Sequence, residues 1–563
     1  MNRSFVFSPN HGTKWHAFEN RFWVGRICLD GAGGFAAKVE VSWEKPLDGR
    51  VNLTLAHWSP PGPRAQVSEL LSTAQIFGVD VEGARSAAMD GSTLGYPLES
   101  LDRVPAGEYF AQAVVNVYET FRRADGHTVK LPPDRGEGQH WNRKPGNLYS
   151  EPVRVRIDPG SSTPVRLSLT KTMPELPAPQ DTKYVHRVKI QSQLLTAFWG
   201  RPMYLGAMVV TPDGFQEHPE RRYPVVYYQN HYTATFSGFQ TEPTSQSRLA
   251  PAYRFYEAWT AGKLPRMLIV IAQDANPYYD DSYAVNSANL GPYGDALVEE
   301  LYPYIEREFH AIGQPWARAL YGGSTGGWRA LALQIFHSDF FNGAWAETPD
   351  PIDFRAYLLV NIYEDGNAFY RTGPWKRVPI PMMHDWEGKV DATMEDAIRF
   401  ELVLGAKNRS GEQFDIWNAV FSPAGADGYP LQIFDPRSGA IDKQVAAYWQ
   451  EHYDLVHILQ VNWATLGPKL VGKIHLQSGS DDAFYLQRAV RLAQQFLEST
   501  KTEGKQPYYA GSVEFSPGMA HGGAVAIPPP PIPAQSFHER VMLAFAEWIR
   551  KSAPAGADLN SWQ

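Results

Sequence analysis

The first third of the chain alternates apolar and polar residues with a period of two. Val39 and Val41 alternate with polar neighbours, and the same pattern recurs over residues 153–157 and 165–169. Half-buried antiparallel strands produce this alternation, because successive side chains of a strand point to opposite faces of the sheet. Several short runs of this kind, separated by glycine, proline and aspartate, predict an all-β, sandwich-like domain.

The pattern changes after a proline-rich stretch at residues 172–183, which lacks periodicity and is interpreted as a linker. Continuous apolar runs at 224–228 and 267–271 are typical of strands covered on both faces. An amphipathic helix is predicted near residues 296–307, with Glu306 among the charged residues on its solvent side. Strands that alternate with helices predict an α/β-hydrolase fold, a mostly parallel sheet flanked by helices.

A sharp turn from a strand into a helix is predicted at residues 322–326, Gly-Gly-Ser-Thr-Gly. Apolar residues precede it, and Trp328, Leu331 and Ile335 follow at helical spacing. Serine hydrolases hold their nucleophile in such a G-x-S-x-G turn, at a strained backbone position with the hydroxyl exposed above the sheet. The glycines remove Cβ atoms that would collide there. Ser324 is therefore the candidate nucleophile.

A serine hydroxyl needs a histidine to accept its proton and a carboxylate to orient that histidine. A carboxylate just past the end of the predicted strand at 473–477 would point into the crevice where ligands bind. Asp482 is therefore the first candidate and Asp481 the reserve, and the alternative is that both only cap the next helix. His521, in a glycine-flanked loop, is the candidate base, whereas His538 is interpreted as a surface residue.

The developing oxyanion of an acyl-transfer site is usually held by backbone N–H groups. One donor is expected from Thr325, the residue after the nucleophile. The second is expected from the loop that follows the strand at 224–228, at His231 or Tyr232. Packing within that loop is the alternative role of these two side chains.

Length and composition limit the number of domains and the kinds of partner and site that the chain can have. The 563 residues predict more than one domain, which we assign as 1–171 (β-domain), 172–183 (linker) and 184–553 (hydrolase). A net charge of -8 without a Lys/Arg-rich run argues against nucleic acid as a partner. Cys28 is the only cysteine, which excludes an internal disulfide and a cysteine-based zinc cluster.

No apolar stretch approaches the roughly 20 residues of a membrane helix, so no membrane partner is expected. The first residues lack the apolar core of a signal peptide. Two expectations stay open: a cytoplasmic protein, or a periplasmic or secreted one whose targeting segment was removed. A homo-oligomer also stays open.

Six segments of the hydrolase part carry a resemblance to a known family: 267–271, 286–293, 300–305, 322–326, 479–482 and 518–521. On these residues the chain resembles the putative-esterase family of α/β-hydrolases, which includes esterase D-like and enterochelin-esterase-like enzymes, over about residues 184–550. The resemblance implies ester hydrolysis by a Ser/His/Asp mechanism without metal or cofactor, carried by Ser324, His521 and Asp482. The substrate would be a small-molecule ester or an ester linked to a glycan or peptide.

The chain departs from that family in two places. Esterases of this group usually have His-Gly after the early strand, whereas this chain has Asn230, His231 and Tyr232, so a differently shaped oxyanion loop is expected. Residues 349–467 are interpreted as an inserted cap. Its aromatic residues are expected mostly to pack, with some lining a substrate cleft. They are Phe354, Tyr363, Phe369, Tyr370, Trp375, Trp386, Trp417 and Trp449.

Residues 76–80, 138–141 and 145–150 resemble the N-terminal β-domain of some uncharacterised bacterial esterases, from which no activity carries over. Trp141 and Tyr149 are its best candidates for stacking on a ligand, and core packing is the commoner role of such residues. The domain would bind substrate, aid dimerisation or shield the hydrolase.

The leading hypothesis is a serine esterase. A peptidase of the prolyl-oligopeptidase type uses the same triad, and it would need a group that binds an amine or a carboxylate. Glu347, Asp350 and Arg355 are candidates for that group, with ordinary solvated charges as the alternative. The third hypothesis is a non-catalytic binding protein on the same fold, which the loss of a triad residue would favour.

Overall fold

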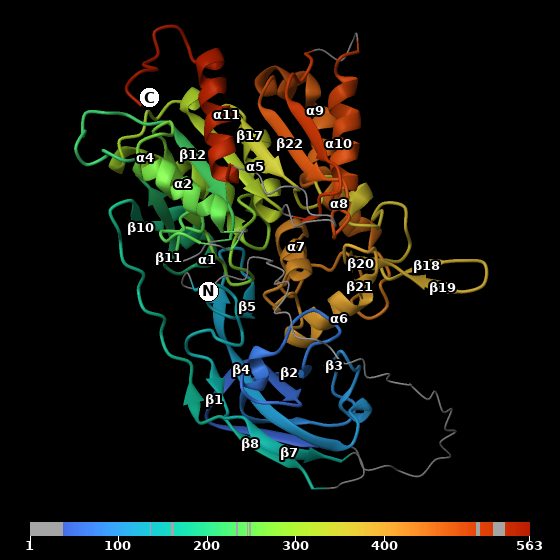
Figure 1. Ribbon diagram of the computed structural model, residues 1–563. Coiled ribbons are helices and arrows are strands. Elements are labelled where there is room, and N and C mark those ends of the chain that lie inside the picture. Colours follow the sequence, from blue (N-terminus) through green and yellow to red (C-terminus); the bar gives the residue numbers. More distant parts are fainter. Residues whose placement is uncertain are drawn as a thin grey trace.

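The computed structural model describes residues 38–134, 137–158, 163–231, 235–244, 246, 249–502, 507–521 and 535–562. The chain start, Cys28 and Tyr232 lie outside these ranges, so the expectations for them stay predictions. Two large sheets dominate the rest, and helices from the middle of the chain lie between them (Figure 1).

The N-terminal sheet is built from nine strands in the described part of the chain. They are β1 (Val39–Ala56), β2 (Gln75–Met89), β3 (Gly95–Tyr96), β4 (Gly107–Arg122), β5 (Thr128–Leu131), β6 (Leu148–Tyr149), β7 (Val153–Ile157), β8 (Val165–Ser168) and β9 (Lys171–Thr172). The main order is β3-β2-β1-β4-β6-β9, with β5 and β7 paired to β4 and β8 paired to β1. The expected antiparallel pairing is wrong for β8, which runs parallel to β1. Thr172, the first residue assigned to the linker, still pairs with Leu148 in this sheet, as part of β9.

Both faces of this sheet are apolar, and each covers a different core. Phe77 and Val115 pack in the sheet's own core, together with residues of β1, β7 and β8. The alternate positions Ile76 and Val114 point the other way. They pack against helix α6 (Met394–Leu404), which comes from a distant part of the sequence. This second core comprises Val67, Ile76, Tyr96, Val114, Trp141, Met173, Phe400, Val403 and Leu404.

The second sheet has eight strands among the described residues, in the order β10-β11-β13-β12-β16-β17-β22-β23. They are β10 (Val185–Ser192), β11 (Met203–Val210), β12 (Val225–Gln229), β13 (Leu268–Gln273), β16 (Arg318–Gly323), β17 (Ala344–Glu347), β22 (Ile474–Gly479) and β23 (Ser512–Ser516). The strands from β13 to β23 are parallel, whereas β10 and β11 are antiparallel to their neighbours. This mostly parallel sheet is the predicted α/β-hydrolase fold.

Helices cover both faces of this sheet (Figure 1). On one face α5 (Thr325–Phe336), α9 (Leu455–Leu470) and α10 (Gln487–Ser499) pack together. On the other, α2 (Ala250–Thr260) and α11 (Phe537–Ser552) meet through the rings of Phe255 and His538. The remaining elements of this region are α1 (Gln193–Trp199), β14 (Asn286–Ser287), β15 (Gly291–Pro292), α3 (Tyr293–Asp295), a π-helical segment (Ala296–Leu301) and α4 (Tyr302–Glu308). None of the helices in the described ranges is long and apolar enough to span a membrane.

Two residues that were expected in solvent are buried. Glu306 forms a two-pronged ion pair with Arg318 of β16, at 2.6 and 2.8 Å. His538 lies in the first turn of α11, where its Nδ1 is 2.8 Å from the hydroxyl of Tyr321, and burial lowers its pKa to about 3. Both lie in predicted helices, but the expected solvent-facing side chain is wrong for each, because a partner on β16, Arg318 or Tyr321, holds it inward.

The region at 349–467 connects the two sheets. It contains β18 (Tyr370–Thr372), β19 (Arg377–Pro379), β20 (Pro381–His384), β21 (Val390–Thr393), α6, α7 (Gln413–Phe421) and α8 (Lys443–His452), and it runs into α9. Arg50 of β1 donates to the main-chain oxygens of Leu402 and Val403, at 2.9 to 3.0 Å. These contacts fix the last turn of α6 on the N-terminal sheet.

Most of the aromatic residues of this region pack, as expected. Phe354, Phe369, Trp417 and Trp449 are buried, and Tyr363 and Tyr370 are half-buried. Trp375 and Trp386 are exceptions and face solvent, Trp375 with 95% of its surface exposed on the loop between β18 and β19. In the N-terminal region Trp141, in the segment between β5 and β6, is likewise a core residue, whereas Tyr149 is half-buried and stacks against Arg64.

Candidate active site

Ser324 lies at the turn between β16 and α5, in a backbone conformation that side chains rarely adopt. Its φ is 56° and its ψ is -125°. Such a residue costs of order 1–3 kcal/mol and persists only where the surrounding structure enforces it. A Cβ at Gly326 would lie 2.0 Å from the main-chain oxygen of Gln229, and one at Gly322 would lie 2.5 Å from the same atom. The two glycines therefore let β12 approach the turn that presents the serine.

A hydrogen-bonded chain of three side chains ends on that serine. Nε2 of His521 is 3.1 Å from Oγ of Ser324, and Nδ1 of His521 is 2.7 Å from Oδ2 of Asp482. The other oxygen of Asp482, Oδ1, accepts the backbone N–H groups of Phe484 and Leu486, at 2.9 and 3.2 Å. One oxygen of this carboxylate thus contacts the histidine, while the other holds the turn that precedes α10.

The electrostatics favour a charged imidazole more than in free histidine. Burial by itself lowers the pKa of His521, but the charge and hydrogen bond of Asp482, with further negative charge from Asp350 and Glu347, raise it above its ordinary value. An imidazolium that forms when Ser324 loses its proton is therefore stabilised in place.

The reserve acid is not in contact with the histidine. Asp481 is exposed, its N–H donates to the main-chain oxygen of Met519 at 3.0 Å, and its carboxylate accepts from Ser480. The turn that holds Asp482 is instead braced from the inserted region, since Nε2 of His384 is 3.1 Å from the main-chain oxygen of Asp482.

A second carboxylate contacts the serine, and sequence reasoning did not place it there. Asp350, three residues after β17, is 4% exposed, so a solvated charge is the wrong interpretation. Its Oδ1 accepts from Oγ of Ser324 at 3.2 Å. Its Oδ2 accepts from the hydroxyls of Tyr283 and Thr325 and from Nε2 of Gln413, at 2.6, 2.9 and 3.3 Å. Burial raises the pKa of Asp350, while the bonds from Tyr283 and Thr325 oppose that shift.

The other two charges considered with Asp350 lie elsewhere. Glu347 faces Arg540 at 3.7 Å, and Arg355 pairs with Asp353. A signal for Asp350 was present in the sequence, because it follows the end of a parallel strand just as Asp482 does.

The backbone amides expected at the oxyanion differ in their present partners. The N–H of Thr325 is the first of α5, so no carbonyl within the helix can accept it. The N–H of His231 donates to Oδ1 of Asn230 at 2.9 Å. Arg329 of α5 donates to the main-chain oxygen of Asn230 at 3.2 Å, which ties this loop to the nucleophile's helix. Tyr232 lies outside the described residues.

The side chain of His231 belongs to a charge cluster in which Asp281 is buried and His231 and Asp280 are half-buried. Its Nδ1 is 2.7 Å from Asp281 and 3.4 Å from Asp280, and the ligand atoms of the three residues lie within 4.8 Å of one another. These are the described residues that could together hold a metal ion. Burial lowers the pKa of His231, but the two carboxylates raise it well above its usual value. Asp280 faces the imidazole of His231, and Asp281 faces both that imidazole and Arg329, which lies 3.7 Å away.

Ser324 opens into a cavity of about 90 Å³ between the two sheets. The described residues that line it come from three parts of the chain: the N-terminal region, the inserted region and the hydrolase core. They are Glu69, Ser324, Asp350, Leu358, Met382, Ala397, Phe400, Glu401, Glu412, Gln413, Phe414, Trp417, Phe484, Leu486 and His521.

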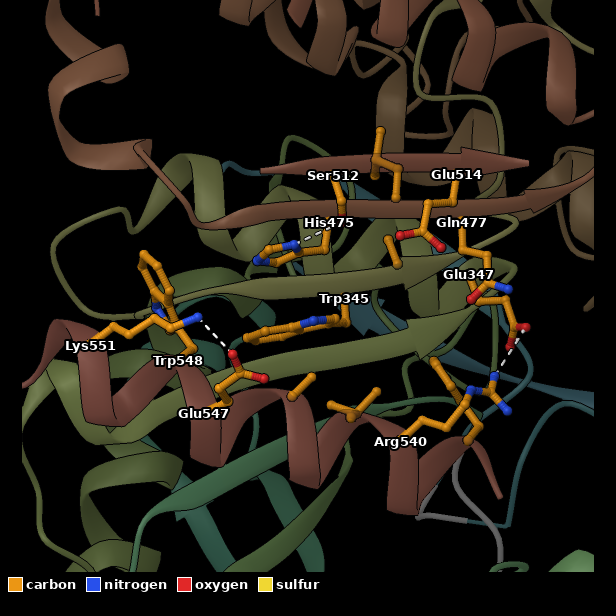
Figure 2. Close-up of a pocket in the computed structure, with 15 residues that line it drawn as sticks. Trp345, Glu347, His475, Gln477, Ser512, Glu514, Arg540, Glu547, Trp548 and Lys551 are labelled. Atoms are coloured by element: carbon orange, nitrogen blue, oxygen red, sulfur yellow. Dashed lines mark hydrogen bonds and ion pairs between the residues drawn. The ribbon is translucent and has the colours of Figure 1, made fainter. Parts of the chain in front are cut away.

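A larger cavity, about 370 Å³, lies beside α11 and contains none of Ser324, His521 and Asp482. Figure 2 shows Trp345 stacked with His475 on its floor, at 4.6 Å between ring centres. His475 also pairs with Ser512, but its second nitrogen faces a main-chain oxygen at 3.0 Å where an orienting carboxylate would be needed. Ser512 lies in the regular strand β23, not in a strained turn. We therefore take the cavity at Ser324 as the candidate active site.

Comparisons with known proteins bear on the hydrolase part. The model of the family described as "Putative esterase" matches residues 202–516. No curated protein matches the chain. Among solved structures, a ferulic acid esterase is 16% identical over 65% of this chain and 97% of its own, with a TM-score of 0.32. An S-formylglutathione hydrolase from Agrobacterium tumefaciens is 13% identical over 67% and 98%, with a TM-score of 0.33. A prolyl endopeptidase is 11% identical over 89% and 58%, also with 0.33. At such TM-scores these structures carry no functional argument.

Proposed function

This chain belongs to the putative esterase family, and we propose that it is a serine esterase that cleaves a carboxylic ester through an acyl-enzyme. Ser324 attacks the ester carbonyl while His521 takes its proton. His521 then passes that proton to the alcohol that leaves, and water releases the acyl group by the same route. Asp482 holds the imidazole so that Nε2 faces the serine. The observation that carries the proposal is the hydrogen-bonded chain from Asp482 through His521 to the strained Ser324.

The oxyanion is proposed to bind the N–H of Thr325, with a second donor from the loop at His231 and Tyr232. The amide of His231 can serve only after Asn230 releases it, because the side chain of Asn230 now accepts that N–H. Substrate binding is therefore expected to change the side-chain conformation of Asn230. No step of this route requires a metal or another cofactor.

The architecture around the site is proposed to be that of a capped, multidomain esterase. Residues 349–467 would form the cap, and its helices α6 and α7 contribute Phe400, Glu401 and Trp417 to the cavity wall. Residues 1–171 would form the sandwich-like domain, 172–183 the linker and 184–553 the hydrolase domain. A small-molecule ester, or an ester linked to a glycan or peptide, is the proposed substrate, with nucleic acid and membranes not expected as partners.

Two other functions are possible on this fold, a peptidase and a non-catalytic binding protein. A peptidase would need a polar group near the serine, and only Asp350 of the three candidates lines the cavity. A non-catalytic binding protein would be favoured by a lost triad residue, whereas Ser324, His521 and Asp482 are joined by hydrogen bonds.

The direct test is hydrolysis of p-nitrophenyl acetate and butyrate by the wild type and by Ser324→Ala. The substitution should lower kcat at least about 10³-fold, because the triad acts as a unit. Ser86→Ala is the matched control, since this serine is exposed on β2 and lies outside the cavity lining. Equal activity of wild type and Ser324→Ala would contradict the proposal.

A further inference from the structure

Ser324 has one proton and two acceptors. Nε2 of His521 lies 3.1 Å from its Oγ and Oδ1 of Asp350 lies 3.2 Å from it, so the hydroxyl can donate to only one of them at a time. Attack on a carbonyl requires the proton to go to His521. In that configuration Oδ1 of Asp350 has lost the one donor that reaches it among the described residues.

This carboxylate oxygen is buried and lies at the cavity. Asp350 is 4% exposed and lines the space above the serine. Its other oxygen is already occupied by Tyr283, Thr325 and Gln413. A buried anion without a donor is unfavourable, so a substrate that brings a donor to Oδ1 is bound better than one that does not.

Apart from His521, the ionisable groups of the described cavity lining are all carboxylic acids. The described residues around the cavity include four carboxylic acids, Glu69, Asp350, Glu401 and Glu412, and no lysine or arginine. Glu401 has a structural role, because it accepts the backbone N–H groups at the start of α7 and its burial raises its pKa. Aromatic rings complete the wall, and their faces attract cations.

On the basis of the proposed function, we propose that the site is specific for esters whose acyl group carries a protonated α-amine, with Asp350 as the residue that recognises the ammonium. In an α-aminoacyl ester the nitrogen is two bonds from the scissile carbonyl carbon. When that carbon lies about 3–3.5 Å from Oγ of Ser324, the ammonium is within reach of Oδ1 of Asp350. The acyl group moves from the alcohol to Ser324 and then to water, so products are the free amino acid and the alcohol.

The test compares two esters that differ only in the amine, p-nitrophenyl L-alaninate and p-nitrophenyl propanoate, at pH 7, where most of the α-amine is protonated. After subtraction of uncatalysed hydrolysis, the wild-type kcat/KM should favour the alaninate at least about tenfold more than hydroxide-catalysed hydrolysis does, because the α-ammonium by itself activates the ester carbonyl. Asp350→Asn should bring the ratio of the two values close to the ratio measured for hydroxide. Using the ratio within each variant cancels any change in the reactivity of Ser324. Glu364→Gln, an exposed acid of the same region outside the cavity lining, should keep the wild-type ratio.

A second measurement needs no variant. L-alaninamide should slow phosphonylation of Ser324 by a fluorophosphonate at least about fivefold more than propanamide does at the same concentration, because only the former carries a charge. Equal protection by the two amides, a wild-type ratio no higher than that of hydroxide, or a wild-type ratio that survives Asp350→Asn would overturn the inference and leave the esterase proposal standing. Failure of the wild type to cleave either ester and to react with the fluorophosphonate would overturn both.

Discussion

Replacing Asp482 by asparagine tests how the histidine is held. In the native site Oδ1 of Asp482 accepts two backbone N–H groups, from Phe484 and Leu486, and Oδ2 accepts Nδ1–H of His521. An asparagine must leave its oxygen on the two backbone donors, because its amide group cannot accept them. The NH₂ of residue 482 then faces Nδ1 of His521. That nitrogen becomes the acceptor, and Nε2 carries the proton toward Ser324, which is the wrong tautomer for a general base.

The expected loss follows from this geometry. The same change of tautomer in a serine protease lowers kcat about 10⁴-fold, which corresponds to about 5.4 kcal/mol of activation free energy. We expect Asp482→Asn to lose about that much kcat for p-nitrophenyl butyrate. The melting temperature should change little, because the two turn hydrogen bonds are kept. Asp481→Asn, one residue away, exposed and without contact to the histidine, is the matched control and should stay within about twofold.

Two results would refute this reasoning. One is an Asp482→Asn variant that keeps more than a tenth of wild-type kcat. The other is an Asp481→Asn variant that loses as much as Asp482→Asn does, since the reserve acid would then share the work of orienting His521.

Three further predictions follow from the site and the core. The kcat/KM for a neutral ester should fall as the pH decreases, with the midpoint of the fall above pH 6.5. His521 must be neutral to accept a proton, and its pKa is raised above the ordinary value. A midpoint below pH 6 would contradict this prediction. Glu306→Gln should lower the free energy of unfolding, measured in urea, by about 3–5 kcal/mol, because Arg318 loses its opposite charge. The exposed Glu308→Gln should lower it by less than about 0.5 kcal/mol. Gly326→Ala should lower the rate of labelling by a fluorophosphonate ~100-fold or more, because the new Cβ would lie 2.0 Å from a main-chain oxygen. Gly366→Ala, with open space around the new Cβ, should be labelled at the wild-type rate.

The sequence predicted the parts of the candidate site that follow from local order along the chain. Ser324 was recognisable because a strand, a glycine-flanked turn and a helix follow one another, and those elements are β16 and α5. Asp482 and His521 followed from the ends of two later strands, β22 and β23, whose C-terminal ends meet at one edge of a parallel sheet.

Residues whose environment is made by distant segments were missed. Asp350 can be buried because Tyr283 and Gln413, which are far from it in sequence, donate hydrogen bonds to its carboxylate. Glu306 and His538 were expected in solvent, but β16 supplies a buried partner for each. Periodicity indicates which face of a helix or strand is apolar. It does not indicate whether a neighbouring element offers a polar partner to a charged residue on that helix or strand.

The contact between the N-terminal sheet and α6 was also not predicted, although one signal was present. Residues 113–115 of β4 are apolar without alternation, and such a run indicates a strand covered on both faces. The covering element could not be named from the sequence, because α6 lies almost 300 residues further along the chain.

The central claim is that Ser324 is an activated nucleophile, and the intact mass after treatment with a fluorophosphonate tests it most directly. We predict a single phosphonyl adduct on the wild type and on Ser86→Ala, and no adduct on Ser324→Ala. An adduct of the same stoichiometry on Ser324→Ala, or an unmodified wild type that is well folded, would contradict the account.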